Sequence, residues 1–262
     1  MKLKRWMLSV PYAIFLVIFV ILPLLVVFYY AFTDGSGHFT MDNFLGFFTN
    51  TKTIGTLVYS LMISLCTTTC CLLIAYPTAY ILAKGPIKRG GVYLILLVMP
   101  MWINFTLRIT ALKEILSAIE GNIAYYTFIN TILCQTYDFL PFMIMPIYTC
   151  LEKIDSQYGE AALDLGAGKV RVFLDVTLPL SMPGIISGIT MVLLPAMTNY
   201  VVLDMIYNST YIMGSLIGSY FSAYDWNNGS MISAVLLALI MLATICGSRL
   251  AGNGEEGRGV AI

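Results

Sequence analysis

The sequence predicts an all-α integral membrane protein with about six transmembrane helices. Of its 262 residues, 59% are hydrophobic and 11% are charged, whereas soluble domains usually carry about a quarter charged residues. A soluble fold of this length cannot bury so much apolar surface, so the bilayer is the expected solvent. The charged residues are also grouped, and they leave uncharged stretches of transmembrane length between them.

Each expected span lies between two groups of charged residues. A transmembrane helix needs about 20 predominantly apolar residues, and five uncharged gaps can hold one. A further stretch, from Glu120 to Glu152, is interrupted only by Asp138, and we interpret it as a span with one buried carboxylate. The first span is expected to be a retained helix, because its apolar run exceeds the roughly 7–15 residues of a signal-peptide core. The expected spans of this single transmembrane domain, 1–262, are 9–32, 55–83, 91–112, 123–150, 180–203 and 230–249.

The positions of lysine and arginine predict that both termini are cytoplasmic. Cytoplasmic loops of membrane proteins carry an excess of these residues. With the N-terminus inside, 11 of the 14 basic residues fall on the cytoplasmic side. The exceptions are Lys52 and Lys113 in outer loops and Arg108 within the third span. The reverse orientation would invert this ratio.

Composition and motifs exclude several classes of function. The 14 basic residues balance 14 acidic ones, so the chain lacks the basic surface that nucleic-acid binding needs. The six cysteines have no zinc-ligand spacing and the single histidine, His38, lies in a polar loop, so no metal site is expected. The segment Gly166-Ala-Gly-Lys169 is not a phosphate loop, because Val170 follows the lysine. We therefore expect no cofactor and no enzymatic centre in this chain.

The main predicted cytoplasmic surface is the loop 151–180. Ser156 is the expected N-cap of a short helix from Gln157 to Leu165. Gly166 and Gly168 are expected to end this helix by adopting left-handed backbone. From the residues alone, the helix suits docking into a groove of another protein and an ordinary amphipathic linker equally well.

The same loop carries a motif with fixed spacing. Its members are Glu160, Ala161, Ala162, Gly166, Val176, Leu178 and Pro179. The pattern resembles the EAA loop of binding-protein-dependent ABC importer permeases, EAA-x3-G-x9-I-x-LP, with Val176 in place of isoleucine. The resemblance implies the MetI-like architecture of a type I ABC importer permease. It also implies that these residues dock the loop onto a cytoplasmic ABC ATPase dimer.

Most of the chain resembles one branch of that family, the B-type permeases of spermidine/putrescine importers. The resemblance implies a polyamine substrate, a second permease of C type, an extracytoplasmic binding protein and a place in the bacterial inner membrane. The stretch between Glu120 and Asp138 and the tail after Arg249 depart from the family pattern. The similar stretches are PMWINFTLRITALK (100–113), LPFMIMPIY (140–148), EAALDLGA (160–167), PLSMPGIISG (179–188) and LLPAMTNYVVLDM (193–205).

The candidates for a substrate path are Asp138, Asp204, Trp102, Tyr200 and Tyr207. A polyamine needs carboxylates for its ammonium groups and aromatic faces for its methylene chain. A carboxylate at membrane depth is costly unless it is paired or lines a water path. Asp138 therefore bonds to a neighbouring helix, faces the path, or lies in a loop if the span ends elsewhere. Counted depths do not require it to pair with Arg108. Taken one at a time, the aromatic residues fit the interfacial belt of a membrane protein better than a binding role.

Three other functions compete with polyamine import. A permease of the same class could carry sulfate, phosphonate or iron, although an anion path would need more basic residues than Arg108 alone. A secondary transporter would be expected to show paired intramembrane acids and an internal repeat, and the sequence shows neither. A membrane scaffold or sensor would have no dedicated contact with an ATPase.

Overall fold

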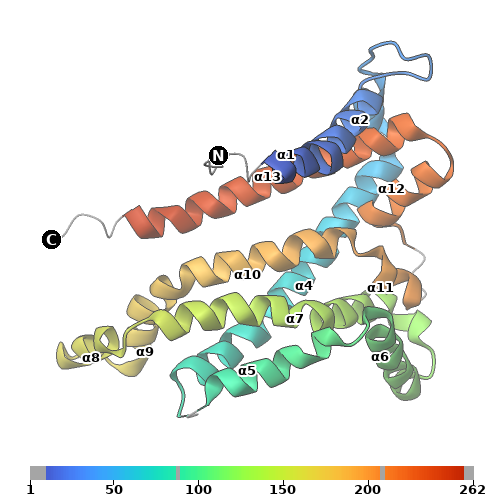
Figure 1. Cartoon of the computed structure of the whole chain (residues 1–262). Coiled ribbons are helices and arrows are strands. Elements are labelled where there is room, and N and C mark those ends of the chain that lie inside the picture. The colour runs from blue at the N-terminus through green and yellow to red at the C-terminus, as the bar shows by residue number, and fades with distance from the viewer. Residues whose placement is uncertain (1–9, 87–88, 207–209, 257–262) are drawn as a thin grey trace. The chain divides into compact units, whose positions relative to one another are not determined.

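The computed structural model describes residues 10–86, 89–206 and 210–256. Every named element within these ranges is a helix, and one isolated bridge pairs Thr33 with Phe39. The prediction of an all-α fold is confirmed. Figure 1 shows the chain, which divides by its contacts into two compact units, Met1–Leu57 with Met213–Leu239 and Val58–Ile212 with Ile240–Ile262.

Several of the described helices are long and apolar enough to cross a membrane. Within the described residues there are four such stretches, and a bent helix pair would be a fifth span. Helix α7 (Thr127–Lys153) has 27 residues, but it carries buried polar side chains such as Gln135 and Asp138. These lower its hydropathy, so a sixth crossing through α7 stays a prediction. The four stretches are Val10–Ala31, Thr51–Lys84, Lys169–Thr198 and Trp226–Ile245, and the bent pair is Gly90–Trp102 with Phe105–Glu120.

The first unit contains a continuous apolar helix whose end is closed by two asparagine side chains. Asn43 Nδ2 donates to the carbonyl oxygens of Ala31 (3.1 Å) and Thr33 (2.9 Å), and Asn227 Nδ2 donates to that of Tyr30 (3.1 Å). The last carbonyls of a helix have no partner within it, so these amides complete the helix end. The elements are α1 (Val10–Leu16), η2 (Val17–Ile21), α2 (Leu22–Ala31), α3 (Asp42–Thr49), the start of α4 (Thr51–Lys84), α12 (Met213–Ser222) and the start of α13 (Trp226–Glu256).

The second unit is built around α7 and α10, which lie side by side (Figure 1). Gly184 of α10 permits their close approach, because a Cβ atom there would lie 2.6 Å from Cys150 Cβ and 2.8 Å from the Pro146 carbonyl oxygen. Small residues commonly let membrane helices pack this closely. Besides the rest of α4 and α13, the elements are α5 (Gly90–Val98), η3 (Met99–Trp102), α6 (Phe105–Glu120), η4 (Ile123–Tyr126), α7, α8 (Ser156–Asp164), α9 (Lys169–Val172), η5 (Phe173–Thr177), α10 (Leu178–Thr198) and α11 (Tyr200–Met205).

The core of the second unit joins α4, α7 and α10 through apolar and polar contacts. Gln135 of α7 bridges the other two helices: its Oε1 accepts from Thr67 Oγ1 (3.1 Å) and its Nε2 donates to the Ala196 carbonyl (3.5 Å). A buried polar group must find such partners, since an unmade hydrogen bond is costly. The apolar part of the core includes Cys71, Ala75, Ala79, Met143, Ile144, Ile147, Ile185 and Val192.

Two π turns lie directly before prolines. In η2 the Leu22 N–H donates to the Val17 carbonyl, one residue before Pro23. In η5 the Leu178 N–H donates to the Phe173 carbonyl, one residue before Pro179. Proline lacks an N–H group and its ring clashes with the carbonyl four residues earlier. The wider turn relieves this clash, so both helices continue past their proline.

The third predicted span is not one helix. The chain bends by 95° between Gly90–Trp102 and Phe105–Glu120. Asn104 caps the second part, since its Oδ1 accepts from the Thr106 N–H (2.9 Å), and Pro100 lies in the 3-10 turn before the break. The expectation of a continuous helix over 91–112 is corrected accordingly.

The fifth predicted span, 180–203, is also corrected. Its helix begins earlier, at Lys169, and ends at Thr198. Asn199 separates it from α11, a helix of 6 residues. Asp204 therefore lies on a separate short helix and does not close the span.

Candidate functional site

The loop with the EAA-like motif forms α8, and its ends are defined by local hydrogen bonds. Asp155 is the N-cap, because its Oδ1 accepts from the Gln157 N–H (3.0 Å), so the assignment of Ser156 to this role is wrong. Gly166 ends the helix with a φ of +85°. Its N–H donates to the Leu163 carbonyl (2.9 Å), and the Ala167 N–H donates to the Ala162 carbonyl (3.0 Å). This pair of bonds is the Schellman motif, which favours glycine at the left-handed position.

Gly168 has a different role from the one expected. Its backbone is extended, with φ −73° and ψ 159°, and it is the residue before α9. The expectation of left-handed backbone at Gly168 is therefore wrong, whereas the same expectation for Gly166 is confirmed. Only Gly166 of the two needs the conformational freedom of glycine.

The second half of the motif joins the loop to the helix bundle of the second unit. Phe173 packs edge-on against Tyr76 and Tyr80 of α4, with ring centroids 5.8 and 5.5 Å apart. Val176 lies half-buried in the π turn, and Leu178 and Pro179 are the first two residues of α10. These contacts link the motif to both α4 and α10.

The first half of the motif lies on an exposed surface. No residue of α8 is buried, and Glu160 and Ala161 are exposed while Ala162 is half-buried. Two large apolar side chains beside the motif are also exposed, Leu165 by 89% and Val170 by 72%. Covering these two apolar side chains with another protein would be favourable, because it removes apolar surface from water.

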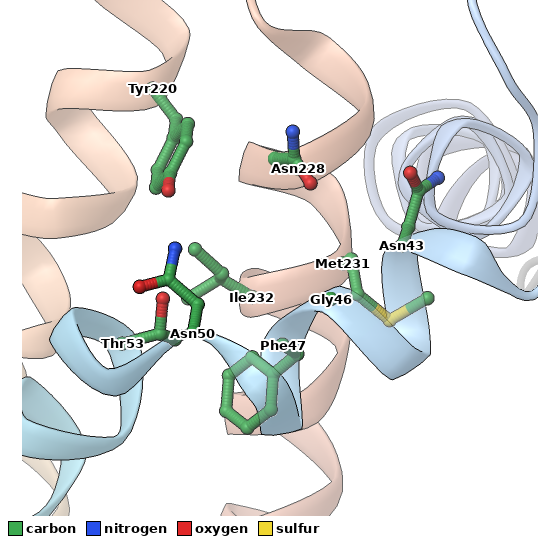
Figure 2. A pocket seen from close by; sticks show the side chains of 9 residues that line it. All are labelled: Asn43, Gly46, Phe47, Asn50, Thr53, Tyr220, Asn228, Met231 and Ile232. Atoms are coloured by element: carbon green, nitrogen blue, oxygen red, sulfur yellow. The ribbon is translucent and has the colours of Figure 1, made fainter.

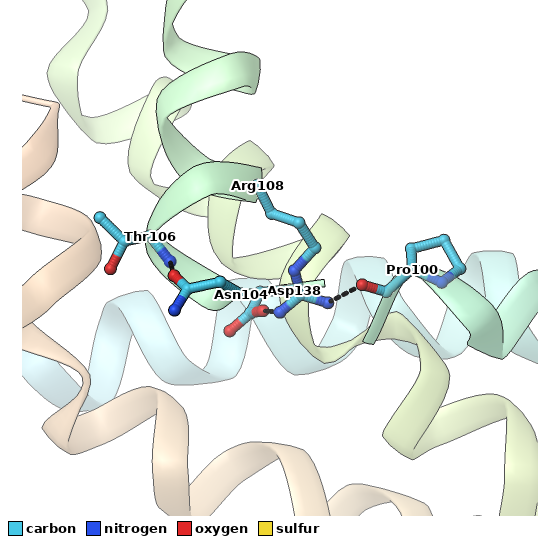
Figure 3. A network of polar contacts seen from close by, with 5 residues as sticks. All are labelled: Pro100, Asn104, Thr106, Arg108 and Asp138. Carbon is cyan, nitrogen blue, oxygen red and sulfur yellow. Dashed lines mark hydrogen bonds and ion pairs between the residues drawn. The ribbon is translucent and has the colours of Figure 1, made fainter. Parts of the chain in front are cut away.

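The break in the third span places Arg108 against Asp138. Arg108 lies on α6 and Asp138 on α7, and their side chains are only 8% and 7% exposed. Figure 3 shows that Arg108 Nη2 donates to Asp138 Oδ1, while Nη1 donates to the Pro100 carbonyl (3.3 Å). The sequence-based count put these charges at different depths because it assumed a straight helix. The ion pair makes the Asp138 carboxylate a partner of the neighbouring helix.

An open hollow of about 370 Å³ lies beside this ion pair. Its volume is within the range of small-molecule sites. Of the residues that line this hollow, only Asp138 was a path candidate from its place in the sequence. Phenylalanines in apolar stretches carry no signal of a site, and Arg108 was recognised only as an isolated charge. The lining residues are Met101, Phe105, Arg108, Asp138, Phe139, Phe142 and Asn199.

The predicted path residues Trp102, Tyr200 and Asp204 lie outside this lining. Trp102 is 80% exposed at the end of η3. Tyr200 and Asp204 are both exposed on α11, four residues apart and hence on one face. Tyr207 lies outside the described residues. Thus Tyr200 and Asp204 share one exposed face of α11, whereas Asp138 lies with Arg108 in the lining of the open hollow.

A second, smaller hollow lies in the first unit (Figure 2). Its volume of about 20 Å³ accommodates about one water molecule, so it is far too small for a flexible diamine. It lies between α3, α4, α12 and α13, and its lining includes Asn43, Asn50, Thr53, Tyr220 and Asn228.

Comparison with known proteins identifies the family. The family described as binding-protein-dependent transport system inner membrane component matches residues 3–253. The spermidine/putrescine transport system permease protein PotB of Escherichia coli (strain K12) is 35% identical over 237 residues, which are 83% of this chain and 86% of that protein. PotB of Haemophilus influenzae is 36% identical over 266 residues, 92% of this chain and 93% of that protein.

Solved structures agree on the fold. A bacterial ABC transporter involved in the import of the acidic polysaccharide alginate aligns with a TM-score of 0.71 at 16% identity, covering 93% of this chain and 94% of that one. The MetNI methionine ABC transporter aligns with a TM-score of 0.60 at 16% identity, covering 77% and 95%. The predicted resemblance to ABC importer permeases is confirmed, and the chain belongs to the family of binding-protein-dependent transport system inner membrane components, which are multi-pass membrane proteins.

Proposed function

We propose that the chain is a permease subunit of an ATP-driven importer of polyamines such as spermidine and putrescine. The observation that carries this proposal is 35–36% identity to two spermidine/putrescine permeases over more than four-fifths of each chain. The partners are a cytoplasmic ABC ATPase dimer, a second permease of C type and an extracytoplasmic binding protein that delivers the substrate. Both termini then lie in the cytoplasm, as the basic residues indicate.

The contact with the ATPase is assigned to the motif of the α8 loop. The assignment is supported by the exposure of Glu160 and Ala161 and by the exposed apolar side chains of Leu165 and Val170. Nucleotide-driven closure of the ATPase dimer moves α8. Phe173, which packs against α4, and the π turn leading into α10 pass this movement to the bundle. Such a movement switches the access of the path between the two sides of the membrane.

The chemistry of the path suits a flexible polycation. Asp204 and Tyr200 lie together on an exposed face of α11, and Trp102 is exposed at the break of the third span. Carboxylates and aromatic faces are the groups that bind alkylammonium ions. By contrast, an anion importer would need basic residues or helix N-termini facing the path.

Reconstitution of the complete transporter tests the proposal. Affinity purification of the chain from native membranes is expected to recover an ATPase, a second permease and a binding protein. In vesicles, this complex should take up labelled spermidine only with ATP, and unlabelled putrescine should compete while sulfate should not. An intact complex that moves other solutes but no polyamine would contradict the proposal.

A further inference from the structure

The Asp138 carboxylate is a buried charge at the edge of an open hollow. The residue is 5% exposed, and its side chain forms an ion pair with Arg108. A buried carboxylate is strongly destabilised when it loses its partner. Any event that moves Arg108 away must therefore supply another cation or a proton to Asp138.

The Arg108 guanidinium is held by fewer hydrogen bonds than it can make. It donates to Asp138 through Nη2 and to the Pro100 carbonyl through Nη1 at 3.3 Å. Its Nε atom is buried and has no hydrogen-bond partner among the described residues. A guanidinium has five N–H donors in total. Because one buried donor is unsatisfied, replacing this guanidinium costs less than replacing a fully bonded one.

The hollow beside the pair has the chemistry of an alkylammonium site. Phe105, Phe139 and Phe142 line it together with Met101, and the rings of Phe139 and Phe142 lie 6.3 Å apart. Aromatic faces attract ammonium groups and also pack against methylene chains. The volume of about 370 Å³ leaves room for such a chain beside the carboxylate.

We propose that Asp138 is an ammonium-binding site whose resting occupant is Arg108, and that a substrate ammonium group enters by exchange with this guanidinium. The inference rests on the proposed function for the identity of the natural substrate. Exchange of one monovalent cation for another keeps the charge of the site constant, so Asp138 is never left unpaired. The displaced guanidinium keeps the Pro100 carbonyl within reach and turns toward Asn199 or water in the open hollow. Its return to Asp138 expels the substrate, which a transporter requires.

Four forms of the complete transporter complex test this exchange: the wild type, Asp138→Asn, Arg108→Gln and the double variant. Binding is measured by saturation-transfer NMR titration with spermidine and with butylammonium, which carries one ammonium group on a short chain. Asp138→Asn is expected to weaken the binding of both probes at least tenfold. Arg108→Gln is expected to strengthen it about tenfold, because the competing cation is gone. Asp42→Asn, an exposed carboxylate change at the start of α3, is the matched control and should leave binding unchanged.

The double variant separates a binding site from a structural brace. It carries two neutral amides that can bond to each other, so neither helix keeps a buried unpaired charge and the complex should assemble. Because it lacks the carboxylate, it should bind both probes as weakly as Asp138→Asn. Wild-type binding in the double variant would overturn the proposal, and so would equal binding in all four forms. If Arg108→Gln does not assemble, the comparison of Asp138→Asn with the double variant still decides.

The two proposals fail separately. Uptake of spermidine by the wild type with no effect of Asp138→Asn on probe binding would refute the site and leave polyamine import standing. Butylammonium binding that depends on Asp138, in a complex that transports no polyamine, would support the ammonium site and refute the proposal of polyamine import.

Discussion

Gly166 offers a sensitive test of the ATPase contact, because its φ of +85° is strained for any residue with a Cβ atom. The left-handed conformation costs an L-residue about 1–2 kcal/mol, and a β-branched side chain lies at the upper end. Nothing lies within 4 Å of a Cβ built at this position, so the backbone term alone decides the effect of Gly166→Val. A cost of 1–2 kcal/mol reduces the ratio of the native turn to other loop conformations by roughly 5- to 30-fold.

We expect Gly166→Val to weaken the affinity of the permease for the ATPase by up to that factor, and to lower uptake, without reducing membrane insertion. Only loops in the native turn can bind the ATPase. When the fraction of such loops falls by a given factor, the apparent affinity falls by the same factor. The affinity is measured by titrating the purified ATPase onto the permease in detergent, and insertion by the amount of chain in washed membranes.

Gly168→Val is the matched control. A Cβ at Gly168 also meets nothing within 4 Å, but its backbone is extended, with φ −73°, which valine adopts readily. Gly166→Asn should recover part of the affinity, because asparagine tolerates left-handed backbone. Equal losses in Gly166→Val and Gly168→Val would refute the argument from backbone conformation.

Three further predictions concern packing, the path and the division of labour. Gly184→Ala should destabilise the protein by about 1–3 kcal/mol, because its Cβ would lie 2.6 Å from Cys150 Cβ, and the melting temperature of the purified chain should fall. Gly218→Ala on α12 is the control: its Cβ meets nothing within 4 Å and alanine favours a helix, so the melting temperature should not fall. Asp204→Asn should lower polyamine uptake roughly fivefold at low substrate, from about 1 kcal/mol for one partly exposed ion pair, with assembly intact; wild-type kinetics would instead make Asp204 an interface anchor. The chain purified alone should hydrolyse no ATP in a phosphate-release assay, and sustained hydrolysis by a pure sample would contradict this.

The spacing of charges was enough to predict most of the long helices, because lysine, arginine and carboxylates are costly in the bilayer core. It could not predict the direction of each helix. The gap between Arg89 and Arg108 has the length of a span, yet the chain turns by 95° within it. Pro100 and the N-cap residue Asn104 are the local signals of this break. The pairing of Arg108 with Asp138 follows from the turn and was therefore missed.

The EAA-like loop shows a second limit, at the level of single residues. Gly166 and Gly168 are identical in type and two positions apart, but only one needs left-handed backbone. Asp155 and Ser156 are both good N-cap residues, and the choice depends on which side chain reaches an N–H of the first turn. The N-cap of α8 and the backbone of the two glycines depend on backbone angles that composition does not encode. The position of α8 itself could be predicted from the pattern of apolar residues.

The π turn between the EAA-like loop and α10 affects how stiff this connection is. A π turn holds one residue more than an α turn, and each residue of an α-helix accounts for about 100° of rotation and 1.5 Å of rise. If the extra residue moves one turn along the helix, only the residues of that turn rotate and shift, by about 100° and 1.5 Å, while the segments on either side keep their relation. At Phe173–Thr177 a side chain can thus change the face on which it lies while α10 stays in place. Movement of α8 then reaches the bundle in a fixed direction because Phe173 packs edge-on against Tyr76 and Tyr80. The stiffness of the helix at the π turn contributes less.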